Sequence, residues 1–225
     1  MTVDNPPVTI LAMSPRRSPS RRKVRPPGAI GTLRLIGGDY RRRRLPVLDS
    51  PGLRPTPDRV RETLFNWLAT QTAGARVLDL FAGTGALGLE ALSRGAREAC
   101  FVERDPRVAT QLVDNLTTLG ADSRGRVVTG DALAFLKGEP SAHSLVFLDP
   151  PFHQGLAAPC CEALEAGWLG EDAFIYMETE ATLEPEIPAH WQLHREVRAG
   201  DSRGRLYRRR SAANTSVESP DSNAC

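Results

Sequence analysis

Cysteine is scarce in this chain of 225 residues: there are four, no two of them form a Cys-x-x-Cys pair, and the four histidines are scattered. That spacing excludes a disulfide framework and a zinc site, and it indicates a reducing, cytoplasmic setting. Long hydrophobic runs are also missing, since the longest near the N-terminus, residues 8–13, is followed by an arginine cluster. We expect neither a secretory signal nor a membrane span, and an Arg-rich transit peptide stays open as an alternative.

Acidic residues are few in the first part of the chain. Residues 1–61 contain 14 Lys and Arg against 4 Asp and Glu, although the net charge of the whole chain is only +2. A basic front attached to an acidic body favours contact with a polyanion, and a merely solubilising surface is the alternative. The Arg/Ser/Pro-rich arm 1–28 and the polar tail 211–225 have almost nothing to bury, so we predict that both are disordered.

Two folded units are expected between these ends. Residues 29–53 predict a basic β-hairpin, with strands over 31–36 and 44–47 around a glycine-rich turn and with the arginine run 41–44 on the returning arm. Residues 54–210 alternate short apolar strands with amphipathic helices, which predicts an α/β domain whose mostly parallel sheet is covered by helices on both faces. Its last three strands lack a long intervening helix and should add antiparallel pairing at one edge.

The first helix of that domain has a sharp start signal. We expect Thr56 to be its N-cap, Pro57 to occupy its first turn and the following aspartate to complement the positive helix end. Apolar residues then recur at helical spacing, at Val60, Leu64 and further along. The pattern predicts a helix that packs one face on the sheet.

A glycine pattern indicates where a nucleotide-like ligand binds. Gly83, Gly85 and Gly88 follow a strand and precede a helix with G-x-G-x-x-G spacing, and Glu103 closes the next strand, where a carboxylate can accept both ribose hydroxyls. NAD and S-adenosylmethionine share this spacing. Asp79, four residues before the first glycine, would repel a pyrophosphate but could orient an ammonium group, so the pattern favours S-adenosylmethionine.

Two alternatives stay open around this loop. A glycine-rich turn that binds nothing has the same sequence pattern. Asp131 closes the third strand, where it could meet the adenine amino group of a cofactor or act as a plain helix N-cap.

The tetrapeptide Asp149-Pro150-Pro151-Phe152 closes the fourth strand on the same side of the sheet as the glycine loop. Two prolines leave a carboxylate, carbonyl oxygens and an aromatic ring without an amide hydrogen between them. Such an acceptor-only corner suits the exocyclic NH2 of a flat base, because Asp149 and the Pro150 carbonyl can accept its two hydrogens while Phe152 stacks on the ring. The chemistry would then be positioning and electrostatics without a metal.

Several long motifs resemble one known family. Residues 34–38 (RLIGG), 54–67 (RPTPDRVRETLFNW), 78–95 (LDLFAGTGALGLEALSRG) and 149–152 (DPPF) are similar to the bacterial 16S ribosomal RNA guanine-N2 methyltransferases of the RsmD family. The likeness runs from about residue 30 to residue 209. It implies a class I, Rossmann-like methyltransferase with a seven-stranded sheet, using S-adenosyl-L-methionine to methylate guanine 966 of 16S rRNA in the small subunit. The arm 1–28 is longer than the family pattern requires, and we assign it no role.

The resemblance also implies roles for single residues. For catalysis it indicates Asp149, Pro150 and Phe152. For the cofactor it indicates Asp79, Phe81, Gly83, Gly85, Glu103, Asp131, Ala132 and Thr56, with Arg54 and Pro55 nearby. The arginines expected to contact RNA phosphates are Arg34, Arg41, Arg42, Arg43 and Arg44. A monomer acting on ribosomal RNA in the cytoplasm, without a membrane or a metal, is the expected context.

Other readings of the sequence stay in view. An adenine-N6 DNA methyltransferase uses the same kind of tetrapeptide, and a non-catalytic RNA-binding assembly factor could retain the fold. Pro159-Cys160 has the form of a cytosine-methyltransferase nucleophile, but its helical spacing predicts a buried structural thiol instead. His153 follows Phe152 directly and could steer the base or a proton.

Overall fold

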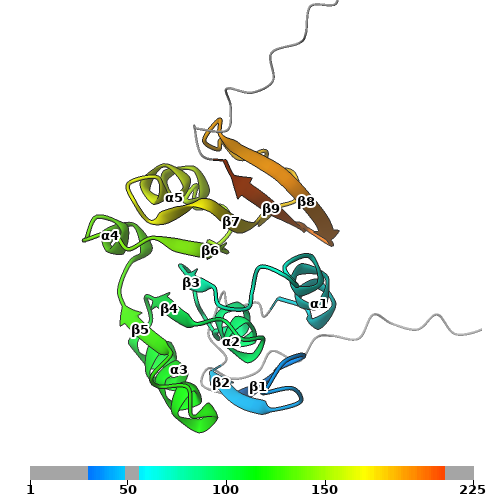
Figure 1. Cartoon of the computed structure of the whole chain (residues 1–225), viewed down its shortest axis with the longest axis vertical. Coiled ribbons are helices and arrows are strands. Elements are labelled where there is room, and N and C mark those ends of the chain that lie inside the picture. The colour runs from blue at the N-terminus through cyan, green and yellow to red at the C-terminus, as the bar shows by residue number, and fades with distance from the viewer. Residues whose placement is uncertain (1–29, 49–55, 211–225) are drawn as a thin grey trace, which may run out of the picture.

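The computed structural model describes residues 30–48 and 56–210, which form a two-stranded and a seven-stranded sheet (Figure 1). The predictions for 1–28, 211–225, Arg54 and Pro55 lie outside the described residues. The strands are β1 (Ile30–Arg34), β2 (Arg44–Leu48), β3 (Arg76–Asp79), β4 (Glu98–Glu103), β5 (Gly125–Thr129), β6 (His143–Leu148), β7 (Leu169–Glu180), β8 (Trp191–Ala199) and β9 (Ser202–Arg209). The helices are α1 (Asp58–Trp67), α2 (Ala86–Ser93), α3 (Pro106–Leu119), α4 (Ala132–Leu136) and α5 (Ala157–Leu164).

The large sheet has the strand order β5-β4-β3-β6-β7-β9-β8. The strands from β5 to β7 run parallel, and β9 pairs antiparallel with both β7 and β8. This confirms the predicted mostly parallel sheet of seven strands with an antiparallel edge. Because β3 pairs with both β4 and β6, the carboxyl ends of these three strands lie side by side.

Side chains of the parallel strands alternate between two hydrophobic clusters, one on each face of the sheet. Val77 and Phe147 belong to a cluster that includes α1, α2, α3 and the hairpin. Leu78 and Val146 belong to the other cluster, which includes α4 and α5. All four side chains are inaccessible to solvent. The period of two along each strand therefore produces the three-layered domain that the sequence predicts.

The start of α1 differs from the prediction. Its N-cap is Pro57, no side chain caps its first turn, and the carbonyl of Pro57 accepts hydrogen bonds from the amides of Val60 and Arg61 (2.9 and 3.1 Å). Pro57 has extended backbone angles, so it makes the transition into the helix itself. Thr56 lies one residue outside and is buried, and the prediction that it is the N-cap is wrong.

The hairpin forms where predicted but with a shorter first strand. β1 ends at Arg34, because the amides of Ile36 and Gly37 leave the ladder and donate to the carboxylate of Glu90 (2.8 Å each). The arginines at 41–43 therefore lie in the connecting turn, and Arg44 alone of the run lies on the returning strand. Placing the whole run on that strand was wrong.

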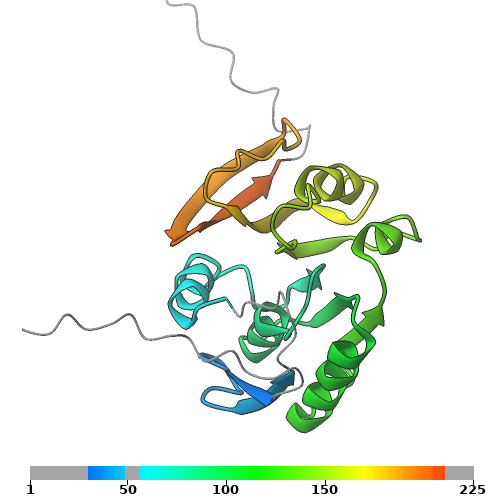
Figure 2. The same cartoon turned by 180° about the vertical axis from the view of Figure 1, so that it is seen from behind.

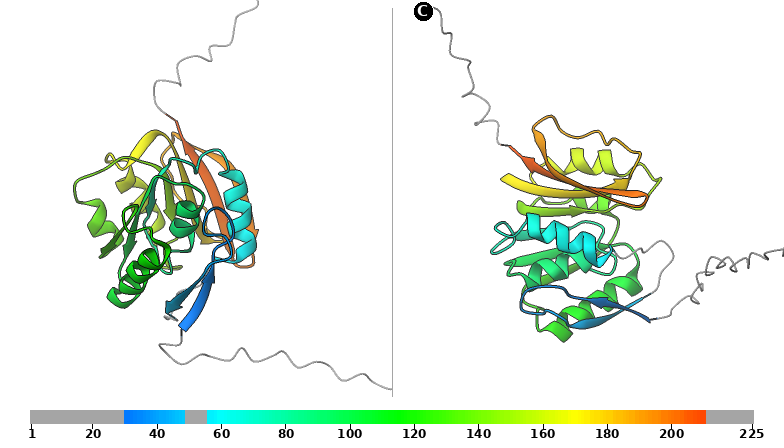
Figure 3. Two further views of the ribbon diagram at one scale, coloured as in Figure 1. Left: turned by 60° about the horizontal axis from the view of Figure 1, so that its bottom comes forward. Right: turned by 90° about the vertical axis from the view of Figure 1, so that its right-hand side faces the viewer.

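The hairpin is a separate sheet that packs on α2 and α3. Glu90 is completely buried in α2, and Ser93 at the end of α2 accepts from the amide of Tyr40 through its hydroxyl (2.9 Å). A Cβ on Gly38 would lie only 1.7 Å from the carbonyl oxygen of Ser93. Seen from opposite sides in Figures 1 and 2, the hairpin lies at one end of the molecule and β8 at the other. Figure 3 shows the hairpin (blue) against the helices of the first face.

Within residues 30–48 and 56–210, none of the helices combines the length and hydrophobicity needed to span a bilayer.

Candidate active site

The two predicted carboxylates accept hydrogen bonds from the glycine turn between β3 and α2. The Gly83 amide donates to Oε2 of Glu103 (2.8 Å), and the Gly88 amide donates to Oδ2 of Asp79 (3.0 Å). Oε1 of Glu103 accepts from the amide of Asp105 (2.7 Å). Each carboxylate oxygen has a second lone pair, and Glu103 is partly exposed, so it can still accept ribose hydroxyls.

Glycine is required at this turn for both conformation and space. Gly83 and Gly85 have φ values of 51° and 74°, in the left-handed region. A Cβ on Gly85 would lie 2.5 Å from Leu112, and a Cβ on Gly88 would lie 2.2 Å from the ring of Phe101. The turn thus holds α2 tightly against β4 and α3, with its N-terminal amides at the carboxyl edge of the sheet. This geometry fits a nucleoside cofactor.

Asp79 is buried, and the pKa of its carboxyl group is unusually high. Burial raises its pKa to about 7, while the hydrogen bond from Gly88 lowers it and the charge of Glu103 raises it further. A cation beside this carboxylate would offset the cost of its burial. The ammonium of S-adenosylmethionine is such a cation, so the residue fits the role predicted for it.

For the remaining residues predicted to contact the cofactor, the structure gives burial and local hydrogen bonds only. Asp131 is exposed at the start of α4, and its Oδ1 accepts from the amide of Ala134 (3.0 Å), so it acts as a helix N-cap. Ala132 is buried, and Phe81 packs half-buried against the second hydrophobic cluster. Contact of these residues and of Thr56 with a cofactor stays a prediction.

The tetrapeptide lies immediately beyond β6 at the same edge of the sheet. Pro150 is buried, Pro151 is exposed, and Asp149 and Phe152 are half-buried. Phe152 is thus partly accessible to solvent. The corner has the acceptor groups and the open ring that stacking on a base requires, and contact with a base stays a prediction.

The carboxyl group of Asp149 is buried, and Glu178 and Asp79 are close enough to affect its pKa. Its pKa is raised well above the ordinary value, first by burial and then by the charges of Glu178 and Asp79. β3 pairs with β6 in parallel, and Asp79 lies opposite Phe147, two residues before Asp149. The two halves of the predicted site therefore follow neighbouring strand ends.

The sequence analysis missed the contribution of β7. Met177 pairs with Leu148 in the parallel register, so Glu178 lies level with Asp149. Glu178 is buried and accepts from the hydroxyl of Tyr176 (3.2 Å). Two residues further on, Glu180 ends the strand. The available signal was a pair of glutamates that closes an apolar parallel strand at the edge where ligands bind.

The predicted RNA-contacting arginines fall into two groups. Arg34 forms an ion pair with Asp58 (2.7 Å), and Arg43 donates to the carbonyl of Thr118 (2.9 Å). Arg41, Arg42 and Arg44 are exposed and have no hydrogen bond or ion pair of their side chains within the described chain. Their contact with RNA stays a prediction.

Cys160 lies where the sequence predicts a structural thiol. It is fully buried in α5, and burial raises its pKa to about 12. A thiol of this acidity is not a nucleophile at neutral pH. His153, in contrast, is exposed beside Phe152, with ring centroids 6.3 Å apart.

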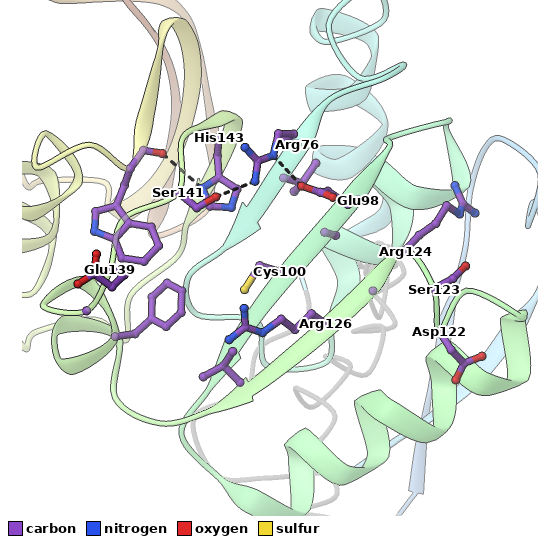
Figure 4. A pocket seen from close by; sticks show the side chains of 17 residues that line it. Arg76, Glu98, Cys100, Asp122, Ser123, Arg124, Arg126, Glu139, Ser141 and His143 are labelled. Carbon is purple, nitrogen blue, oxygen red and sulfur yellow. Dashed lines mark hydrogen bonds and ion pairs between the residues drawn. The ribbon is translucent and has the colours of Figure 1, made fainter.

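A cavity of about 590 Å³ opens at the opposite edge, near the amino ends of β3 to β6 (Figure 4). Cys100 and Phe135 line it where the five-residue α4 leaves the sheet uncovered. In its wall, Arg76 donates to Glu98 (2.6 Å) and to Ser141 (2.7 Å). The cavity is separate from the candidate active site.

A sheet of this strand order, with a glycine turn after its first strand, β3, and an Asp-Pro-Pro-Phe corner after the neighbouring β6, defines a class I S-adenosylmethionine-dependent methyltransferase. A solved structure, the putative methyltransferase yhhF from Escherichia coli, has a TM-score of 0.75 and 52% sequence identity to this chain, and covers 80% of this chain and 99% of its own.

Sequence comparison narrows this class to one family. Residues 33–208 match the family described as Conserved hypothetical protein 95. Ribosomal RNA small subunit methyltransferase D of Escherichia coli (strain K12) is 51% identical over 190 residues, which is 84% of this chain and 96% of that protein. The protein of the same name from Haemophilus influenzae is 46% identical over 190 residues, covering 83% and 98%. The chain therefore belongs to this family, the RsmD family.

Proposed function

We propose that the protein transfers a methyl group from S-adenosyl-L-methionine to the exocyclic N2 amino group of guanine 966 in 16S rRNA. The observation that carries this proposal is the parallel pairing of β3 with β6, in which Asp79 lies opposite Phe147, so that the cofactor turn and the base corner follow neighbouring strand ends. The names of the family relatives, which specify small subunit ribosomal RNA, support the choice of polymer.

The residues of the tetrapeptide hold the target amine. Asp149 and the carbonyl of Pro150 accept its two hydrogens, and Phe152 stacks on the guanine ring. S-adenosylmethionine, when bound, would supply a sulfonium methyl group whose carbon a nitrogen lone pair can attack, with the thioether sulfur of S-adenosylhomocysteine as the leaving group. Because both amine hydrogens are held, the nitrogen lone pair is directed away from the corner, toward the cofactor turn. Asp149, whose pKa is raised by burial and by its acidic neighbours, is then suited to accept the proton that the amine loses.

The cofactor would be held by groups along the carboxyl edge. Glu103 accepts its ribose hydroxyls, and Asp79 orients its ammonium group. The absence of side chains at Gly83 and Gly85 lets the cofactor come close to the protein backbone. The further lining residues that we assign to it are Phe81, Thr56, Asp131 and Ala132. Thr56 and Asp131 offer side-chain oxygens as acceptors where S-adenosylmethionine has donors, and Phe81 and Ala132 offer apolar contact.

The basic hairpin would contact the phosphates of the rRNA. Arg41, Arg42 and Arg44 carry the exposed charge, and such contacts position RNA without selecting a base. We assign base selection to the corner at Phe152. The substrate would be the small subunit or its assembly intermediate in the cytoplasm, met by a monomer of this chain.

Methyl transfer to defined substrates tests the proposal. Purified protein is incubated with tritiated S-adenosylmethionine and small subunits that lack the modification, and naked 16S rRNA and double-stranded DNA are run in parallel. We expect label on one guanine of the subunit RNA. Label on adenines of DNA would instead support an adenine-N6 methyltransferase, and calorimetry showing no binding of S-adenosylmethionine would support a non-catalytic assembly factor.

A further inference from the structure

The loop after β6 has few interactions that fix its shape. Pro150 and Pro151 have no amide hydrogen, and within the described chain no backbone–backbone hydrogen bond involves residues 149–155. His153 has a φ of 62°, a left-handed conformation that non-glycine residues rarely adopt. A turn of this kind persists only when a neighbouring group holds it.

Glu180, the last residue of β7, is that neighbouring group. Its Oε1 accepts a hydrogen bond from the backbone amide of His153 and lies 3.2 Å from Nδ1 of the same residue. The Glu180 side chain is only 17% exposed, whereas the imidazole is 85% exposed. Burial acts to raise the pKa of Glu180, but hydrogen bonds from the amides of Glu180 and His153 outweigh it, so the group is a carboxylate at neutral pH.

The contact links a rigid strand to the aromatic ring of the corner. Phe152 immediately precedes His153, and their rings meet edge to face with centroids 6.3 Å apart. The orientation of one peptide unit therefore affects both rings. β7 is buried along most of its length, so its carboxylate is a fixed reference point for a loop that otherwise lacks one.

We propose that Glu180 is a positioning residue for the target base: by holding the backbone turn at His153, it fixes the ring of Phe152 on which the base stacks. This inference rests on the proposed function, because it assumes that Phe152 contacts the guanine. Glu180 itself touches neither the base nor the cofactor in this scheme. The interaction that matters is with the backbone amide, and the imidazole contact is secondary.

Three variants of the full-length protein separate this role from a general structural one. E180A removes the acceptor, E180Q keeps a carbonyl oxygen that can accept from the His153 amide, and E196A is a matched control on exposed β8. The measurements are hydrogen–deuterium exchange of the peptide spanning 149–156, the Kd of S-adenosylmethionine, and kcat and KM for unmodified small subunits.

For E180A we expect exchange at His153 to rise at least about tenfold and kcat/KM to fall at least about tenfold. The Kd of S-adenosylmethionine should stay within about threefold of the parent value. E180Q should recover most of the activity, and E196A should match the parent protein. H153A keeps the backbone amide and should lose less than E180A.

Two outcomes would overturn the role of Glu180 while leaving the enzyme's function intact. One is unchanged exchange and full activity in E180A, and the other is an equal loss of cofactor binding and activity in E180A and E180Q. If the parent protein binds S-adenosylmethionine but methylates no subunit, the proposed function fails and the assignment of Phe152 to a guanine fails with it.

Discussion

At the scale of single residues, carboxyl groups gather at the ends of three neighbouring strands, β3, β6 and β7. Asp79 ends β3, Asp149 follows β6, and Glu178 lies near the end of β7. The charge of Glu178 and that of Asp79 both raise the pKa of Asp149, on top of the effect of burial. A hydrogen-bond donor or a cation bound beside Asp149 would therefore favour the ionised form of its carboxyl group.

The acidity of Asp79 predicts that cofactor binding depends on pH. Its pKa is about 7 in the folded protein against an ordinary 3.8, so its burial costs stability as the pH rises from about 4 to about 7. An ammonium beside it favours the carboxylate, so the affinity for S-adenosylmethionine should fall by up to about tenfold per pH unit below pH 7. Titration calorimetry at pH 6 in buffers of different ionisation enthalpy should detect the released proton. D79N should bind more weakly and lose this pH dependence, and a parent protein with equal affinity at pH 5.5 and 7.5 would contradict the assignment.

Replacing Asp149 tests the base corner separately from the cofactor turn. D149N keeps the size of the side chain but exchanges one acceptor oxygen for a donor, so the target amine loses a partner. We expect kcat for unmodified subunits to fall by about a hundredfold or more, with the Kd of S-adenosylmethionine within about threefold of the parent value. Rapid-quench measurement of a single turnover checks the chemical step directly. A D149N protein with normal single-turnover rates would remove Asp149 from the mechanism.

At the scale of elements, the hairpin depends on the C-terminal half of α2. The buried carboxylate of Glu90 accepts from two amides of the hairpin connection and from Arg94 (2.8 Å), and Ser93 bonds the following turn. Charged groups buried in this way are costly to leave without partners. The hairpin and α2 therefore form one unit, although among residues 30–48 and 56–210 no ladder joins the small sheet to the large one.

Gly38 is the position where this docking is most sensitive to substitution. A Cβ there would lie 1.7 Å from the Ser93 carbonyl oxygen, and its φ is +71°. G38A should destabilise the protein by about 2 kcal/mol or more and raise hydrogen exchange over the hairpin. G74A is the matched control, because Gly74 also has a positive φ (+75°) but has no atom within 4 Å of the added methyl group. An equal loss of stability in G38A and G74A would show that the close approach of Gly38 to Ser93 contributes nothing to the sensitivity.

The exposed arginines of the hairpin turn predict a salt-dependent contact. Replacing Arg41 and Arg42 with glutamine should weaken binding to 16S rRNA and reduce the salt slope by about 1 to 2, since each phosphate contact contributes about 0.7 to 0.9. Arg195 and Arg198 on β8 are exposed at the far end of the molecule and supply a charge-matched control pair. Fluorescence anisotropy over a range of salt concentrations measures both slopes. If the two double variants behave alike, the turn has no special part in binding RNA.

At the scale of the whole molecule, the sheet was predictable because its signals are local. Apolar strands with a period of two, a helix start such as Asp105-Pro106 and the left-handed glycine that ends α3 at Gly120 each specify one element through backbone chemistry. The glycine pattern and the tetrapeptide likewise lie within short stretches of chain. The alternation of strands with helices predicts a parallel sheet, and this was enough to predict that the glycine turn and the tetrapeptide lie at the same edge of it.

The features that the sequence did not predict depend on distant partners. Arg61 interrupts the apolar face of α1 yet is almost completely buried, because Asp58 (2.6 Å) and the carbonyl of Arg34 (3.0 Å) accept from it. Glu178 and Glu180 come to lie beside the tetrapeptide and its loop only through the register of β7 on β6. Such long-range pairings have no signature in the spacing of residues along the chain.

Helix α2 has one further consequence because its two ends have different attachments. Its first residues follow the glycine turn, and the amide of Gly88 donates to Asp79. Its last residues bind the hairpin, because Glu90 and Ser93 accept hydrogen bonds from hairpin amides. Eight helical residues span about 12 Å, short enough to behave as a stiff rod. In the proposed scheme, a rotation of α2 at the glycine turn would also move the hairpin that carries the exposed arginines, so cofactor binding and RNA contact would be coupled through this helix.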